Sequence, residues 1–187
     1  MSVDQYPDWI RPPTGGCTAD DLDRLPDLPP HTELIDGSLI FVSPRTKFHV
    51  RTIRALEHAL LAAVPQGWEV WREMTVKLNP RNRPEPDLVV VDERSDTGSD
   101  QTFFLAEDVL LVVEVVSEES KERDRDAKPR KYAAAGIPHF WRVESDGGRP
   151  VVYVYELDPA TGGYGVAGIH HKVLKLDRPF PVDVELV

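Results

Sequence analysis

The chain has 187 residues, of which 41% are hydrophobic and 29% are charged, a composition that is typical of a soluble globular protein and excludes a disordered one. Acidic residues outnumber basic ones by 32 to 22, and the resulting net charge of -10 argues against a general nucleic-acid coat, because affinity for DNA comes largely from Lys and Arg at phosphates. No apolar run approaches the roughly 20 residues of a membrane span, and the single cysteine, Cys17, excludes an internal disulfide and a cysteine-rich zinc site.

These limits predict one domain over residues 1–187, without a membrane span. A cytoplasmic location is expected because the chain has a single cysteine,. The first 17 residues are rich in Pro and Gly and are expected to form an irregular N-terminal arm.

The segment after the arm is predicted to hold a short helix and a hairpin. Thr18 is a residue type that favours helix N-caps and is followed by two acids, so a short helix is expected to about Leu25. Asp36-Gly37 lies between two apolar runs and is a strong two-residue turn signal. Residues 32–42 are therefore predicted to form a β-hairpin.

A long helix is predicted over residues 47–64, where apolar residues recur at helical spacing,. His49 falls on the apolar face of this helix. Its favoured interpretation is a buried, hydrogen-bonded or capping histidine, and a site role is the alternative. Residues 68–78 alternate between apolar and polar types and are predicted to form one or two strands.

Two runs of branched aliphatic residues predict strands that are buried on both faces of a sheet. The first run, residues 88–91, follows Asp87, and the second, residues 109–116, is interrupted only by Glu114. The polar residues 93–107 between them are expected to form a loop. An ionised carboxylate in a buried strand is costly unless it is paired or bound to a metal, so Glu114 needs a partner.

The charged segment 117–135 has a helical pattern, but Pro129 lies inside it. Since Pro is tolerated in the first turn of a helix and not in its middle, we expect a kink or a new helix that starts at Pro129. Further strands are predicted over residues 139–144, 151–157 and the remaining C-terminal sequence. This mixture predicts an α/β fold with a central sheet and extra C-terminal strands.

Asp87 and Glu114 together suggest a site for a hard cation such as Mg²⁺ or Mn²⁺, which takes one or two carboxylates plus water and phosphate oxygens. Such an ion makes water more acidic and stabilises charge on a phosphate. Lys128 is the candidate to orient the attacking water or neutralise the developing charge, with Lys131 one helical turn later. Glu33 is a candidate third acid if folding brings it to the site.

Each candidate also has a structural interpretation. Asp87 could be a turn former after Pro86, and Glu114 could form a buried salt bridge with Arg142 or Lys128. Lys128 and Lys131 could be solvated helix charges, and Ser117 and Ser120 are predicted to be helix caps. The sequence holds no Gly-x-Ser-x-Gly motif, Gly-rich phosphate loop or dinucleotide fingerprint,, so metal-assisted phosphate chemistry is the leading hypothesis.

Pro86-Asp87 followed by Glu114-Val115-Val116-Ser117 resembles the acidic motifs of the PD-(D/E)XK nuclease superfamily. In the common form a lysine stands two residues after the second acid, where this chain has Val116. The chain is similar to the restriction endonucleases of the Uma type, in which the lysine is displaced onto the next helix. Over about residues 30–145 the matching pieces are Glu33–Gly37, Ser43-Pro44, His49, Pro86–Val91, Val113–Ser117, Asp124-Arg125 with Lys128, Lys131–Ala133, Gly136–Pro138 and Phe140–Val143.

The resemblance implies a restriction-endonuclease-like fold, with a mixed central sheet flanked by helices and the acids and lysine at one edge. It also implies Mg²⁺- or Mn²⁺-dependent cleavage of DNA phosphodiester bonds. By motif match Asp87 and Glu114 would bind the metal, Lys128 would be the displaced lysine and Glu33 the accessory acid. A homodimer is expected because a duplex has two strands to cut.

Two other functions stay open at this point. The first is a non-catalytic protein on a nuclease scaffold that acts by binding protein or nucleic acid. The second is a metal-dependent hydrolase of a smaller phosphate compound, which the acidic net charge favours.

Overall fold

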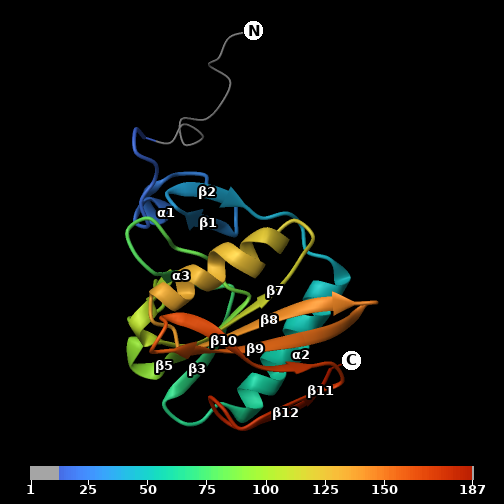
Figure 1. Ribbon diagram of the computed structural model, residues 1–187. Helices are drawn as coiled ribbons and strands as arrows, with labels where there is room; N and C mark the ends of the chain where they lie inside the picture. Colours follow the sequence, from blue (N-terminus) through green and yellow to red (C-terminus); the bar gives the residue numbers. More distant parts are fainter. Residues whose placement is uncertain (1–12, 187) are drawn as a thin grey trace.

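The computed structural model describes residues 13–186 and centres on a six-stranded mixed sheet (Figure 1). The first twelve residues of the predicted arm lie outside the described residues. The strands follow the order β10-β9-β8-β7-β5-β3, with β7 and β8 parallel and all other neighbours antiparallel. Their bounds are Trp68–Arg72 (β3), Leu88–Asp92 (β5), Val109–Val115 (β7), His139–Asp146 (β8), Arg149–Asp158 (β9) and Gly163–His170 (β10). The predicted α/β class with a central sheet and extra C-terminal strands is confirmed.

The two aliphatic runs form the centre of the sheet, as their composition predicts. Four of the five residues of β5 are buried, and so are six of the seven residues of β7. Strands with apolar side chains on both faces need a covering layer on each side. The apolar runs therefore fix which two strands lie deepest in the molecule.

One face of the sheet is covered by α2 (Lys47–Ala63) and by a C-terminal hairpin, β11 (Val173–Leu176) with β12 (Val182–Glu185). The other face carries α3 (Lys128–Ala134) and a small parallel pair, β4 (Thr75–Lys77) with β6 (Phe103–Leu105). Figure 1 shows α2 and α3 on opposite sides of the strands. The helix predicted over residues 47–64 is confirmed as α2.

The predicted N-terminal hairpin is present as β1 (Thr32–Ile35) and β2 (Ser38–Phe41). Its turn residues Asp36 and Gly37 have φ values of 52° and 81°, the left-handed conformations that a two-residue hairpin turn requires. The hairpin forms a separate sheet beside the short helix α1 (Asp21–Arg24), and both lie at one end of the molecule (Figure 1).

Arg83 attaches this N-terminal unit to the segment that leads into β5. Its backbone exchanges two hydrogen bonds with Leu34 of β1, at 3.0 and 2.8 Å. Its buried guanidinium donates to both carboxylate oxygens of Asp23, at 2.6 and 3.0 Å. A bidentate pair of this kind fixes orientation as well as distance, so the hairpin is held next to the start of β5.

Two segments refine the expectations from sequence. The predicted loop over residues 93–107 contains β6, in which Phe103 and its neighbours pair with β4, because these aromatic and apolar residues suit a half-buried strand,. The break predicted at Pro129 is present: a π-helix, η5 (Arg123–Ala127), precedes α3, and Pro129 lies in the first turn of α3.

Within residues 13–186, no helix has both the length and the apolar character needed to cross a membrane.

Candidate active site

The predicted acids meet at the end of the sheet where β5 begins and β7 ends. Leu88 is paired with Val113 across the two antiparallel strands. Asp87 directly precedes Leu88 and Glu114 directly follows Val113, so the two acids are neighbours at that end of the sheet. The Val115 amide donates to Asp87 Oδ2 at 2.6 Å. The strand register alone therefore brings together two acids that are far apart in the chain.

Glu114 faces the α3 side of the sheet. Side chains alternate along a strand, and Val112, on the same face as Glu114, packs in the cluster that contains Tyr132 of α3. The Tyr132 hydroxyl donates to Glu114 Oε1 at 2.6 Å, and Lys128 Nζ lies 3.1 Å from the same oxygen. Burial raises the pKa of Glu114 well above its ordinary value, because the opposing effect of the Lys128 cation is smaller.

Lys128 lies where η5 meets α3. A π-helix is often found at functional sites, and here the wide turn lies directly before the helix whose first turn holds Pro129. The ammonium is almost fully buried and lies 2.7 Å from Glu33 Oε1, 3.1 Å from Glu114 Oε1 and 3.4 Å from Asp124 Oδ1. Burial alone would lower the pKa of Lys128, but the three carboxylates outweigh it and hold the pKa well above its ordinary value.

Glu33 reaches the site from the N-terminal hairpin. Its side chain is 2% exposed, and Oε1 accepts a 2.9 Å hydrogen bond from the Glu85 amide in addition to its contact with Lys128. This amide lies two residues before Asp87. The hairpin and the segment that begins β5 therefore hold the two acids in a fixed relation.

Asp87 is also contacted from the start of α2. His49 Nε2 lies 3.0 Å from Asp87 Oδ1, and Arg45 Nη1 donates to the same oxygen at 2.6 Å. Burial raises the pKa of Asp87, but the contacts with His49 and Arg45 and the amide hydrogen bond outweigh burial and bring the pKa below its ordinary value. His49 is buried, as favoured from the sequence, and it contacts a site candidate as well.

The four sequence candidates line one cavity of about 210 Å³. Four carboxylates on its wall, each no more than 3% exposed, face two cations from Lys128 and Arg45. The carboxylates are those of Glu33, Asp87, Glu114 and Asp124. Glu85, Glu118, Glu119 and Arg123 also line the cavity. Its carboxylates therefore outnumber its cations, and a divalent cation would offset the excess negative charge when they are ionised.

The buried carboxylates of the cavity meet part of what a divalent metal requires. Within residues 13–186 no three His, Cys, Asp or Glu side chains are grouped as metal ligands, so the geometry does not match an all-protein metal cage. Mg²⁺ commonly uses only one or two carboxylates and completes its shell with water and substrate oxygens. Asp87 and Glu114 fit that lighter requirement, since both are buried carboxylates on the same cavity.

Other charged residues weighed from sequence lie elsewhere. Lys131 pairs with the exposed Asp36 at 2.5 Å. Arg142 is adjacent to Glu114 across β7 and β8 but pairs with Glu144, at 2.8 Å, on its own strand. Of the two salt-bridge partners considered for Glu114, the structure provides Lys128.

Asp124 and Arg45 are two of the cavity residues that received no site role from the sequence. Asp124 is 2% exposed, lines the cavity and has an Oδ1 without a hydrogen-bond donor. Burial raises its pKa, against the effect of Lys128. Asp124 precedes Lys128 by four residues, so both lie on one side of a helical segment. This spacing could have identified Asp124 as a site residue from the sequence. Arg45 lies in the irregular segment between β2 and α2. Without a helical or strand repeat, the sequence gives no sign of the direction in which its side chain points.

Comparisons with known proteins show the family of this chain and its fold. The sequence matches the Uma2 family, described as "Putative restriction endonuclease", over residues 19–187. Among solved structures the chain is similar to "a putative nuclease belonging to DUF820" from Anabaena variabilis ATCC 29413, with a TM-score of 0.64 and 16% identity over 85% of this chain and 88% of that one. At this identity the likeness shows the shared fold.

Two further structures are matched weakly. They are NucC of P. aeruginosa ATCC27853 and NucC of E. coli MS115-1, both in the cAAA-bound form. The first has a TM-score of 0.34 and 12% identity over 70% of this chain and 85% of its own. The second has a TM-score of 0.35 and 14% identity over 71% and 86%. A search of curated proteins found no match.

The matched residues include β5 and β7 with their acids, α3 with Lys128, and the C-terminal strands. This chain therefore belongs to the Uma2 family of restriction endonuclease-like proteins.

Proposed function

We propose that this protein is an endonuclease that hydrolyses DNA phosphodiester bonds with the help of Mg²⁺ or Mn²⁺. The observation that carries the proposal is the meeting of Asp87, Glu114 and Lys128 on one cavity, in a chain that belongs to a nuclease-like family. Lys128 and Glu33 are proposed as the remaining functional residues of the site, Lys128 as a catalytic cation and Glu33 as the acid that positions it.

Asp87 and Glu114 are the residues that would hold the metal ion. When bound, the ion would supply Lewis-acid chemistry at a phosphate oxygen and make water more acidic. The negative charge that the carboxylates leave in excess supports this assignment. Hydrogen bonds fix the orientation of both carboxylates: the Tyr132 hydroxyl donates to Glu114 and the Val115 amide donates to Asp87.

Lys128 is proposed to act as a fixed cation. Because its pKa is held well above the ordinary value, the ammonium stays protonated and cannot serve as the general base at neutral pH. Its charge can stabilise the negative charge that develops on a phosphate under attack. Glu33 is a positioning residue in this scheme, since it holds Lys128 at 2.7 Å.

The size of the cavity favours a polymeric substrate over a small phosphate compound. Pockets that enclose a drug-sized ligand usually have volumes of about 300–1,000 Å³, whereas this cavity has about 210 Å³. It can admit one phosphate group and water while the rest of the substrate stays outside. A homodimer is proposed on chemical grounds, because a duplex has two strands to cut.

The test compares wild-type protein with E114Q on supercoiled and single-stranded DNA, with Mg²⁺, with Mn²⁺ and with chelator. Wild type is expected to cut only with metal, and E114Q is expected to lose cutting while it stays folded. E107Q is the matched control, because Glu107 is exposed on the short helix Ala106–Asp108. Nucleotides assayed beside DNA separate the small-substrate alternative.

Metal-dependent cutting that persists in E114Q would refute the assigned site. Absence of cutting by folded wild-type protein with both metals and both DNA forms would favour the non-catalytic binding scaffold. Light scattering of the same samples measures the oligomeric state.

A further inference from the structure

Arg45 occupies the place on Asp87 that an incoming cation would use. Asp87 Oδ2 accepts the Val115 amide at 2.6 Å, which leaves Oδ1 as the oxygen on the side of the cavity. Arg45 Nη1 already lies 2.6 Å from Oδ1. A divalent ion on the same oxygen would lie within a few ångströms of the guanidinium, and like charges at that separation repel strongly.

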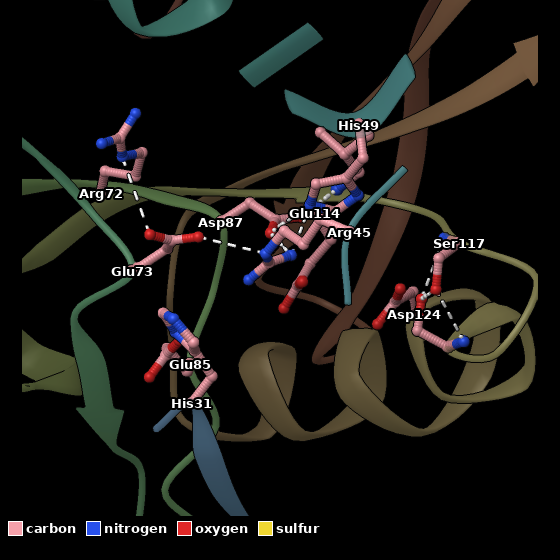
Figure 2. Close-up of polar contacts among 12 residues, drawn as sticks. His31, Arg45, His49, Arg72, Glu73, Glu85, Asp87, Glu114, Ser117 and Asp124 are labelled. Carbon is pink, nitrogen blue, oxygen red and sulfur yellow. Dashed lines mark hydrogen bonds and ion pairs between the residues drawn. The ribbon is translucent and has the colours of Figure 1, made fainter. Parts of the chain in front are cut away.

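Glu73 gives Arg45 a second carboxylate. Arg45 Nε lies 3.1 Å from Glu73 Oε1, and Figure 2 shows the guanidinium between Glu73 and Asp87. The Glu73 amide also donates to the backbone carbonyl of Asp87 at 3.3 Å. The arginine can therefore leave one carboxylate and still keep an ionic partner.

The backbone of Glu73 supports a specific role for this carboxylate. Glu73 lies in the turn between β3 and β4 with a φ of 55°, a left-handed conformation that costs energy for a residue other than Gly, Asn or Asp. Glycine would fit this turn at lower cost. Strain retained at a residue that contacts a site residue points to a use for its side chain, and here the side chain pairs with Arg45.

We propose that Arg45 is the resident cation of the metal-free site, and that it moves off Asp87 onto Glu73 when a divalent metal ion binds. The inference rests on the proposed function, because it assumes that Asp87 takes the metal. Arg45 thus adds a permanent positive charge beside a buried carboxylate whose other partners among the described residues are His49 and the Val115 amide,. The same contact lowers the affinity of the site for metal.

The experiment measures Mn²⁺ binding to the metal-free, full-length protein by isothermal titration calorimetry, without DNA. R45M is expected to bind Mn²⁺ with a Kd roughly tenfold lower than wild type, a change equivalent to about 1.4 kcal/mol, because the competing guanidinium is gone. E73Q is expected to shift the Kd the other way, because Arg45 then has Asp87 as its remaining carboxylate partner. R45K keeps the charge and should bind no tighter than wild type.

R72M is the matched control. Arg72 also pairs with Glu73, at 3.8 Å, but it is about half exposed and its other ion-pair partner is Glu57 rather than Asp87 (Figure 2). Its loss should leave the Kd for Mn²⁺ unchanged. The same variants are heated with and without Mn²⁺, because a ligand that binds the native state raises Tm. R45M should have the lower Tm in chelator and the larger rise on adding Mn²⁺.

The outcomes separate this inference from the proposed function. Mn²⁺ binding by wild type with an equal or higher Kd in R45M would overturn the role of Arg45 and leave the metal site in place. Failure of wild type to bind Mn²⁺, or equal binding by D87N, would overturn the metal site itself and the inference with it.

Discussion

Lys128 Nζ lies 2.7 Å from Glu33 Oε1, and both side chains are almost fully buried. The contact joins the N-terminal hairpin to the helix that follows the central strand. It places one ammonium among three carboxylates, since Glu114 and Asp124 lie within 3.4 Å of the same nitrogen. The ion cluster therefore ties together three parts of the chain as well as forming the wall of the cavity.

Replacing Lys128 should be strongly destabilising. In K128M three buried carboxylates lose their common cation, and breaking a buried ion pair from one side costs about 3–5 kcal/mol. Urea unfolding in chelator measures the loss. K131M is the control: Lys131 pairs with Asp36, whose side chain is 70% exposed, so the loss should be below about 1 kcal/mol. Equal losses in the two variants would show that the buried cluster contributes no more to the free energy of unfolding than an exposed ion pair does.

The Tyr132 hydroxyl should contribute more to the free energy of unfolding than a hydroxyl bonded to a neutral group does. It donates to the buried Glu114 carboxylate, and hydrogen bonds to charged groups contribute about 1.5–3 kcal/mol. Y132F should therefore lower the free energy of unfolding by that amount while the ring keeps its packing on Phe140. Y164F removes a hydroxyl that donates to a neutral carbonyl, that of Ile137, and should cost about 0.5–1.5 kcal/mol. Chemical unfolding of both variants makes the comparison, and a smaller loss in Y132F would contradict it.

Asp124 should affect metal binding more than stability. Burial raises the pKa of Asp124, Lys128 and Ser120 oppose this, and the nearby acids Asp87 and Glu33 raise it further. D124N removes a costly buried charge and should unfold at the same or a higher urea concentration. The cavity loses one negative charge, and the Kd for Mn²⁺ should rise about tenfold, equivalent to 1.4 kcal/mol. D126N is the control, because Asp126 is 66% exposed and pairs with Arg130. An unchanged Kd in D124N would remove Asp124 from the site.

His139 should make the protein sensitive to mild acid. It is buried at the start of β8, and burial lowers its pKa below 6.5, with Arg178 acting in the same direction and Glu156 opposing. The unfolded chain then binds the proton more tightly than the folded one, so the stability contributed by the neutral ring is complete above pH 6.5 and is lost as the pH falls below it. Urea unfolding across this range should show a shallower acid loss in H139Q than in wild type. H58Q, at an exposed position of α2, should keep the wild-type slope, and a wild-type slope in H139Q would contradict the prediction.

The sequence by itself determined the elements that carry local patterns. The aliphatic runs predicted the central strands β5 and β7, helical spacing predicted α2, and Asp36-Gly37 predicted the first hairpin. A carboxylate inside an apolar strand also marked Glu114 as a residue that needs a partner, which is a consequence of desolvation alone. The order of short motifs pointed to the family that the comparison shows. The site roles of the four candidates stay predictions.

Only the tertiary structure decided which charges meet. Glu33 reaches Lys128 because Arg83 fixes the hairpin beside β5, and Arg45 reaches Asp87 because the N-terminus of α2 lies at the same sheet end. Nothing in the local sequence shows such encounters, since a charged residue in a loop has the same pattern whether it is solvated or buried. The strand β6 was missed for a similar reason: three residues gain strand geometry only from their partner β4. Secondary structure follows short-range periodicity, whereas the cavity depends on register and packing between distant segments.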